Sequence, residues 1–269
     1  MNKTTDIRKV FMPFQPATRF EPEFTLYKEH LPDSRLAPYI YYYWEFKTIK
    51  PLLNGLEYRV VPNGCIDIYF ELQQPSKSIV TGFSDKSSSV TLQNEFHYFG
   101  ICFMPSVFPL IYNINATELT NRYFDLGLVA PNTANFITNE LDAELSSSRI
   151  IDSLNTHFLN LTNSKAFRID YRLLDAIDLI FKTGGNLSLD ADLKTGLSQR
   201  QLRRLFNFYI GNNPKTFCKV VRFQSFLQKN TILKVAASNF DYLDYGYYDQ
   251  SHFIKEFKTL FGKTPRQAY

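Results

Sequence analysis

The sequence predicts an α+β protein in which a β-rich amino-terminal domain is followed by an all-α carboxyl-terminal domain. Three observations lead to this prediction. Short aromatic and β-branched runs separated by turn residues occupy about the first hundred of the 269 residues. From residue 165 onward, apolar residues instead recur at three- and four-residue steps, as they do in amphipathic helices. A pattern of apolar-x3-Phe-x4-Gly-x2-Pro also occurs twice, and only in this later part.

Four runs in the amino-terminal part are expected to form β-strands: YIYYYWEF (39–46), EYRVV (57–61), CIDIYFEL (65–72) and FHYFGICF (96–103). Asn63 and Gly64 lie between the second and third runs, and we predict a hairpin there, because this pair accepts the positive φ of a tight turn. Several short strands at this spacing favour a β-sandwich or a β-barrel.

Helices are expected to follow the strands, over residues 114–127 and 132–161. The next stretch, LTNSKAF (161–167), is polar and without periodicity, which indicates a domain boundary. We therefore predict a β-rich domain with a helical connector over residues 1–164. An all-α domain is predicted over residues 165–269.

The repeated pattern predicts two helix-turn-helix units. Each copy places two apolar side chains one helical turn apart, so that both face the same core. Its Gly suits a left-handed residue at a helix end, and its Pro prevents the helix from resuming. Ser198 and Asp249 are the expected N-caps, and the apolar stretch 216–228 predicts a buried linker helix between the units. The paired positions are Leu202 and Phe253, Phe206 and Phe257, Gly211 and Gly262, and Pro214 and Pro265.

Charge is divided unevenly between the two predicted domains. Residues 165–269 hold 17 Lys and Arg against 9 Asp and Glu, a net charge of +8. Residues 1–164 hold 13 against 17, a net charge of −4. Such asymmetry suggests a polyanion-binding module attached to a domain with another task.

The helices that begin after Ser198 and Asp249 are expected to present polar, mostly cationic outer faces. Arg and Gln match the hydrogen-bonding edges of guanine and adenine in the major groove, and Lys neutralises phosphates. A solvated helix face is the alternative, but the repetition of this face in a basic domain favours DNA binding. The outward residues are Gln199, Arg200, Arg203 and Arg204 on the first helix, and Gln250, Ser251, Lys255 and Lys258 on the second.

Two stretches, GLSQRQLRRLF and GYYDQSHFIKEFKTLFGKTPRQAY, resemble the carboxyl-terminal domain of the AraC/XylS transcription regulators. The resemblance implies that some outward side chains read bases and that others hold phosphates. The implied base-reading residues are Gln199, Arg200, Arg203, Gln250, Ser251 and Lys255, and the implied phosphate contacts are Ser198, Arg204 and Lys258. Asp192 and Tyr242 depart from the family, which usually has an alanine at both positions.

The amino-terminal half, in stretches such as SRLAPYIYYYWEF and YRVVPNGCIDIYFEL, resembles the sensor-like domain that precedes this DNA-binding domain in some of these regulators. That resemblance implies a cupin-like β-barrel with trailing helices, which binds a small effector, makes a dimer, or both. The aromatic residues Tyr41, Tyr43, Trp44 and Tyr69 are candidates for effector contacts. Such residues suit a ring-shaped ligand, but they are equally what fills a small barrel.

Other chemistry finds little support in the sequence. The four His residues show no metal-binding spacing, and the three Cys residues are widely separated, so we expect no metal site and no cofactor. Without a P-loop, a dinucleotide-binding motif or a catalytic cysteine cluster, we do not expect an enzyme. The free cysteines, and the lack of a secretory or membrane-spanning segment in this sequence, favour a cytoplasmic protein.

The sequence thus predicts a sequence-specific transcription regulator of bacterial type that binds double-stranded DNA through two recognition helices. A small effector, a homodimer and contact with RNA polymerase are expected parts of its action. The alternative is a ligand-binding or enzymatic barrel whose helical tail no longer binds DNA. Tyr242, Asp241 and Asp244, which lie close to the second recognition helix, motivate this alternative.

Overall fold

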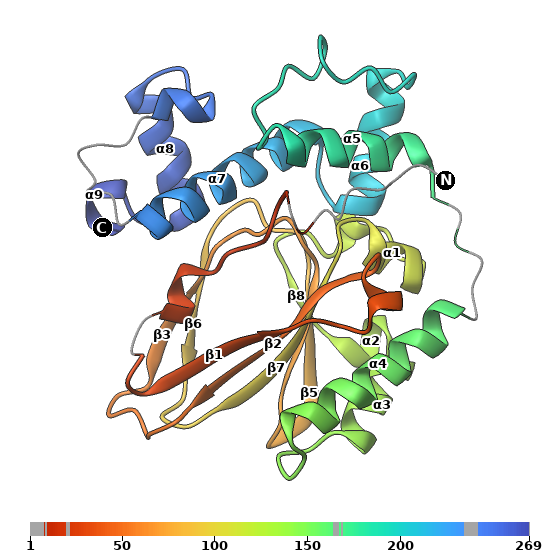
Figure 1. Ribbon diagram of the computed structural model, residues 1–269, viewed down its shortest axis with the longest axis vertical. Helices are drawn as coiled ribbons and strands as arrows, with labels where there is room; N and C mark the ends of the chain where they lie inside the picture. Colours follow the sequence, from red (N-terminus) through yellow and green to blue (C-terminus); the bar gives the residue numbers. More distant parts are fainter. Residues whose placement is uncertain are drawn as a thin grey trace.

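The computed structural model describes residues 8, 10–19, 22–163, 167, 169–233 and 242–268. Antiparallel sheets and short helices form an amino-terminal unit, and a set of longer helices lies across one end of it (Figure 1). The predicted α+β class, with strands first and a purely helical carboxyl-terminal part, is confirmed. The predicted domain boundary falls on residues 164–166, which lie outside the described part, so the division into two domains stays a proposal.

Two antiparallel sheets make up the amino-terminal unit. The larger has the order β1 (Thr25–His30), β2 (Ile40–Thr48), β7 (His97–Phe103), β4 (Asp67–Glu71), β5 (Gln74–Thr81) and β8 (Tyr123–Asp125). The smaller pairs β3 (Leu56–Val60) with β6 (Ser88–Leu92). In the described residues β1 and β8 remain at the edges of the larger sheet, so the structure resembles a barrel without being closed.

The larger sheet is covered on both faces, and strand alternation decides which side chains go where. One face packs against the short helices of this unit through buried residues such as Ile68, Phe99 and Ile101. The opposite face, which carries Trp44 and Tyr69, looks toward the two-stranded sheet. The covering helices are α1 (Val107–Tyr112), α2 (Leu126–Val129), α3 (Pro131–Glu140) and α4 (Ser147–Asn163).

Two sequence predictions about this unit are wrong. Asn63-Gly64 does not form a hairpin, because β3 pairs with β6 whereas β4 pairs with β5 and β7. Gly64 does adopt the expected positive φ of 84°, but the turn carries the chain from one sheet to the other. Residues 114–127 are not one helix either. Asn121 has a φ of 58°, which ends helical geometry, and the following residues form β8 beside β5.

The carboxyl-terminal unit consists of α5 (Tyr171–Lys182), α6 (Gln199–Ile210), α7 (Pro214–Leu233), α8 (Gln250–Phe261) and α9 (Pro265–Ala268). The predicted helix ends are confirmed: Ser198 and Asp249 cap α6 and α8 through their side chains. Gly211 and Gly262 end these helices with φ values of 105° and 85°.

The linker helix α7 is apolar around most of its circumference and is buried, as expected. Phe217, Val220, Phe223 and Phe226 are all 0% exposed. They belong to an apolar cluster that includes side chains of both units, such as Phe83 of the β-rich unit. The helix is therefore an inner wall shared by the whole molecule.

Gln224 is the polar exception on α7, and its side chain is also fully buried. Its Oε1 accepts a hydrogen bond from the backbone N–H of Phe14 at 2.7 Å. Its Nε2 donates to the carbonyl oxygens of Phe14, at 3.1 Å, and Pro62, at 2.6 Å. One side chain therefore joins α7 to the amino-terminal segment and to the connection between β3 and β4.

A second buried polar group, Glu45 of β2, joins the sheet to α4. His97 and Lys47 contact its Oε1 at 2.8 Å and 2.7 Å. His30 contacts Oε2 at 3.3 Å, and the Ser147 hydroxyl donates to the same atom at 3.0 Å. Burial opposes ionisation, but the hydrogen bonds outweigh it and hold the pKa of Glu45 well below its ordinary value.

Gln224→Ala is expected to lower the free energy of unfolding by about 1–3 kcal/mol, because it removes the hydrogen bonds that join α7 to the backbone of Phe14 and Pro62. Urea unfolding of the full chain would measure the change. Lys215→Ala, at an exposed site of the same helix, is the control and should change stability by less than about 0.5 kcal/mol. Equal effects of the two substitutions would show that the Gln224 contacts do not stabilise the fold.

Glu45→Gln should make stability less sensitive to acid. Because the folded state depresses the pKa of Glu45, the stabilisation is complete above the unfolded value of about 4.3 and is lost as the pH falls below it. Urea midpoints of the natural chain should therefore drop more steeply between about pH 5 and pH 3 than those of the variant. Glu144→Gln, at an exposed position, should retain the steep dependence. Parallel pH profiles for the natural chain and Glu45→Gln would contradict the assignment.

Candidate nucleic-acid interface and ligand cavity

The first candidate reading helix is α6, and its sequence fixes both where it begins and which face it buries. The Ser198 hydroxyl accepts from the backbone N–H of Gln201, whose side-chain oxygen accepts in return from the N–H of Ser198. Leu202, Phe206 and Ile210 are buried. The opposite face leaves Gln199, Arg200, Arg203 and Arg204 exposed, as predicted.

Among the residues that the structure describes, the cations on this outer face have no acidic partner. Within the described part of the chain, Arg200, Arg203 and Arg204 form no ion pair, so their guanidinium groups are available to another molecule. Gln199 differs, because its amide donates a hydrogen bond to the carboxylate of Asp190 in the preceding loop. That bond uses one of the two amide N–H donors of Gln199.

The second candidate reading helix, α8, is built in the same way. The Asp249 carboxylate accepts from the N–H of His252 at 2.7 Å. Phe253, Phe257 and Phe261 are buried, whereas Ile254 is 37% exposed. Ile254 therefore lies on the exposed face of α8, one helical turn from both Ser251 and Lys258. The exposed polar residues are Gln250, Ser251, Lys255 and Lys258, as predicted.

Glu256, the acidic residue of α8, points into the molecule. It is 7% exposed and lies 3.6 Å from Arg222 and 3.9 Å from Lys219, both on α7. His252 of the same helix is 3.6 Å away. The carboxylate is therefore neutralised at the contact between α7 and α8, and the outer face of α8 keeps its positive charge.

The two candidate helices pack against successive parts of α7 (Figure 1). Phe206 of α6 contacts Phe217, whereas Phe257 and Phe253 of α8 contact Phe223 and Phe226 further along the helix.

The preceding helices of the two units are less regular than predicted. In the first unit, Ser188–Asp192 forms only a turn, with the N–H of Asp192 donating to the carbonyl of Ser188 at 2.8 Å. In the second, residues 234–241, including Asp241, lie outside the described residues. Tyr242–Tyr245 then forms a short 3-10 helix, in which Asp244 is exposed.

A cavity of about 190 Å³ lies between the two sheets of the β-rich unit. Aromatic side chains from alternate positions of the strands form part of its walls. Two of the four candidate effector contacts, Trp44 and Tyr69, line it. The other aromatic lining residues are Tyr27, Tyr42, Phe46, Tyr58, Tyr98 and Tyr123.

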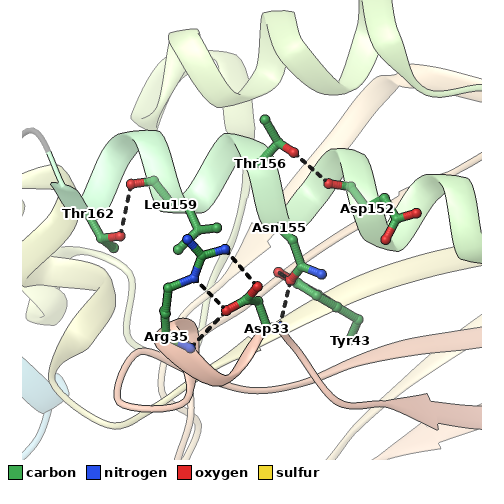
Figure 2. A network of polar contacts seen from close by, with 8 residues as sticks. All are labelled: Asp33, Arg35, Tyr43, Asp152, Asn155, Thr156, Leu159 and Thr162. Carbon is green, nitrogen blue, oxygen red and sulfur yellow. Dashed lines mark hydrogen bonds and ion pairs between the residues drawn. The ribbon is translucent and has the colours of Figure 1, made fainter.

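Tyr41 and Tyr43 do not line the cavity. Neighbouring residues of a strand point to opposite faces, so Tyr43 cannot share the orientation of Trp44. Figure 2 shows that Tyr43 points toward α4, where its hydroxyl donates to the side-chain oxygen of Asn155 at 3.1 Å. Tyr41 is fully buried in the apolar cluster shared with the helical unit.

Asp67 is a cavity residue that the sequence interpretation missed. It lies at the start of β4, two residues before Tyr69, and so faces the same side of the sheet. Burial raises the pKa of its carboxyl group to about 6, against hydrogen bonds from Cys102 and Asn63 that favour the charged form. The alternation of Asp67 with Tyr69 was the sequence feature that could have identified it.

Two loops at the edge of the cavity also contact the carboxyl-terminal ends of both reading helices. The N–H of Ser87, a cavity residue, donates to the carbonyl of Thr259 in α8 at 3.1 Å. Asp85, in the same loop, accepts from the side chain of Asn212 at 3.1 Å. From the second loop, the Thr120 hydroxyl donates to the carbonyl of Gly211, which ends α6, at 2.6 Å.

Comparisons with known proteins agree with this geometry. Residues 193–268 match the family described as "Helix-turn-helix domain", and residues 28–125 match "Domain of unknown function (DUF6597)". No curated protein matches the sequence. The first matched segment contains both reading helices, and the protein is thus a helix-turn-helix DNA-binding protein. This match confirms the helix-turn-helix domain that the resemblance to the AraC/XylS regulators predicted for the carboxyl-terminal part.

Solved structures of ToxT from Vibrio cholerae are also similar. One is 12% identical, with a TM-score of 0.44 over 91% of this chain and 97% of that chain. A structure of an apo ToxT variant is 8% identical, with a TM-score of 0.42, and the match covers 90% of this chain and 95% of that chain. A third, of unsaturated fatty acid bound ToxT, is 12% identical, with a TM-score of 0.38, and the match covers 91% of this chain and 92% of that chain. Similarity this low carries no argument about the function of this chain.

In the described part of the chain, every helix is too short or too polar to cross a membrane. Within the same residues, no group of three His, Cys, Asp or Glu side chains is arranged to hold a metal ion.

Proposed function

We propose that the protein regulates transcription by reading two neighbouring major-groove segments, one with α6 and the other with α8. The observation that carries this proposal is that two helices with exposed, cationic faces both pack against one buried helix. A shared buried helix would hold the two faces at a fixed spacing, which tandem reading helices need in order to meet successive turns of DNA.

Within this proposal the side chains divide into two tasks. Arg200 and Arg203 read guanine edges through paired N–H donors, and Gln250 reads adenine. Lys258 and Arg204 neutralise phosphates and hold the register of the complex. The remaining proposed base contacts are Gln199, Ser251 and Lys255, and Ser198 is a proposed phosphate contact.

We further propose that a small effector in the β-rich unit controls DNA binding. The support is that loop residues such as Ser87 line the cavity on one side and bond the end of a reading helix on the other. A ligand that moves these loops would change the positions of α6 and α8 relative to each other. Pairing of two copies also belongs to this proposal, and an operator with repeated half-sites would accommodate such a pair. Contact with RNA polymerase is a further part of the proposal.

Arg203→Ala is expected to weaken binding to a cognate DNA fragment by about 1–3 kcal/mol, because a paired contact to a base edge is lost. Genomic fragments captured by the full chain and then sequenced would supply the cognate DNA. Mobility-shift titrations would compare this DNA with a random duplex, on which the loss should be smaller. Arg149→Ala, on the exposed surface of α4, is the matched control and should leave both affinities unchanged. An equal loss on both duplexes would exclude base reading by Arg203.

Lys258→Ala should weaken binding to cognate and random duplexes alike, because a phosphate contact carries no sequence information. The slope of log affinity against log salt should fall by about one, the value for one phosphate contact. Filter-binding titrations at a series of salt concentrations would measure the slope. Failure of the natural chain to retain any duplex at low salt would support the rival interpretation, a ligand-binding barrel with an inactive helical tail.

A further inference from the structure

The register of the larger sheet groups the cavity residues closely. Cross-strand pairing places Tyr42 beside Cys102 and Cys102 beside Asp67, in one row across β2, β7 and β4. In the next row, Gly100 lies between Trp44 and Tyr69. Adjacent strands are about 4.8 Å apart, and successive rows on one face are about 6.6 Å apart. The Asp67 carboxyl group is therefore close to several aromatic rings.

Gly100 opens the space that the Trp44 indole occupies. A side chain at this position would overlap the indole ring, which lies across β7 at the bottom of the cavity. The centroids of the Trp44 and Tyr69 rings are 6.3 Å apart. The indole and the phenol rings thus form a continuous wall with exposed π-faces, next to Asp67.

The Asp67 carboxylate is only partly satisfied. Its Oδ2 accepts from the side-chain N–H of Asn63 at 3.2 Å. Its Oδ1 is buried and has no hydrogen-bond partner in the described part of the chain, nor does Asp67 form an ion pair there. A buried acceptor without a donor is costly, and an N–H group from a ligand would remove that cost.

The sign of the charge selects the ligand. An ionised carboxylate in an aromatic cavity attracts a cation, and the π-faces of Trp and Tyr stabilise the same cation. Lys86 and Arg122, the other charged residues of the cavity wall, are both exposed, so water and salt screen their positive charge more than the charge of the Asp67 carboxylate. A cavity of about 150 Å³ holds benzene, so about 190 Å³ accommodates one ring with a short chain.

We propose that the effector of this cavity is a small organic monocation, an arylalkylamine or an amine of similar size, whose ammonium group pairs with the carboxylate of Asp67 and lies against the rings of Trp44 and Tyr69. The assignment rests on the proposed effector control, because it names the ligand class for the same cavity. A neutral polyol that stacks on the same rings is the competing ligand class.

Trp44 is the single tryptophan of the chain, so its fluorescence reports directly on the cavity. Titration of the full chain with 2-phenylethylamine and with its neutral analogue 2-phenylethanol distinguishes the contribution of the ammonium charge to affinity from that of the aromatic ring. We expect the amine to bind roughly tenfold or more tightly than the alcohol at pH 7.5, in line with an added ion pair and cation–π contact. Its affinity should fall as the pH drops through about 6, where Asp67 of the free protein becomes protonated.

Asp67→Asn should remove the preference for the amine and leave the alcohol affinity within about twofold, since it keeps the shape of the side chain and removes its charge. Asp152→Asn, at an exposed position of α4, is the control and should bind like the natural chain. Should Asp67→Asn fail to fold, the amine-to-alcohol ratio of the natural chain still decides the matter.

Equal affinity for amine and alcohol, a preference for glucose or another neutral polyol, or no fluorescence response to either probe would each overturn the proposal. Mobility shifts with and without 2-phenylethylamine separate this result from the proposed function. DNA binding without amine binding rejects only the ligand class. Amine binding that depends on Asp67 but leaves DNA binding unchanged supports the ligand class and rejects effector control.

Discussion

The structure depends on the burial of α7, a helix that is apolar on too many sides to be stable at a surface. Two helix-turn-helix units cover part of it, and the β-rich unit with its amino-terminal segment covers the rest. Each fully buried Phe or Val contributes about 1.5–3 kcal/mol relative to an exposed one. Apolar burial alone does not fix the orientation of α7, but Gln224 does, because its three hydrogen bonds form together in one arrangement of α7, Phe14 and Pro62. The spacing of α6 and α8 and their position over the sheets follow from that arrangement.

Strand alternation divides the polar chemistry of the β-rich unit into two separate tasks. On the helix-covered face, Glu45 is surrounded by donors and holds α4 against the sheet. On the other face, Asp67 lines a cavity and has two donors, Asn63 and Cys102, but one of its oxygens has no hydrogen-bond partner among the described residues. Both are buried carboxylates, but the first has its pKa lowered by its partners and the second has its pKa raised by burial. Both oxygens of the Glu45 carboxylate have partners within the protein, so its role is structural. The Asp67 carboxylate has an oxygen without a partner among the described residues and is therefore available for a ligand.

Local patterns in the sequence were enough to predict the helical unit, because its determinants lie within a few residues of one another. The caps at Ser198 and Asp249 and the glycines that end α6 and α8 are such local features, and all were predicted correctly. The sheet depends on distant pairing, which turn chemistry does not reveal: Asn63-Gly64 makes the expected backbone turn, yet the flanking strands pair elsewhere. The cavity was partly predictable. Alternation from Trp44 indicates Tyr42 and Phe46 and excludes Tyr43, but only the fold brings Asp67 beside them.

Control of DNA binding from the cavity requires that a ligand distinguish two arrangements of the reading helices, because a ligand that fits both equally shifts nothing. The contacts to the helix ends make such a distinction physically reasonable. Gly211 and Thr259 are bonded by loops at the edge of the cavity, whereas the buried sides of α6 and α8 are held by α7. A small loop movement can therefore tilt a reading helix about its packed side without unfolding it. Two helices that must meet neighbouring grooves together are sensitive to such a tilt, since a change at either end spoils their common register on DNA.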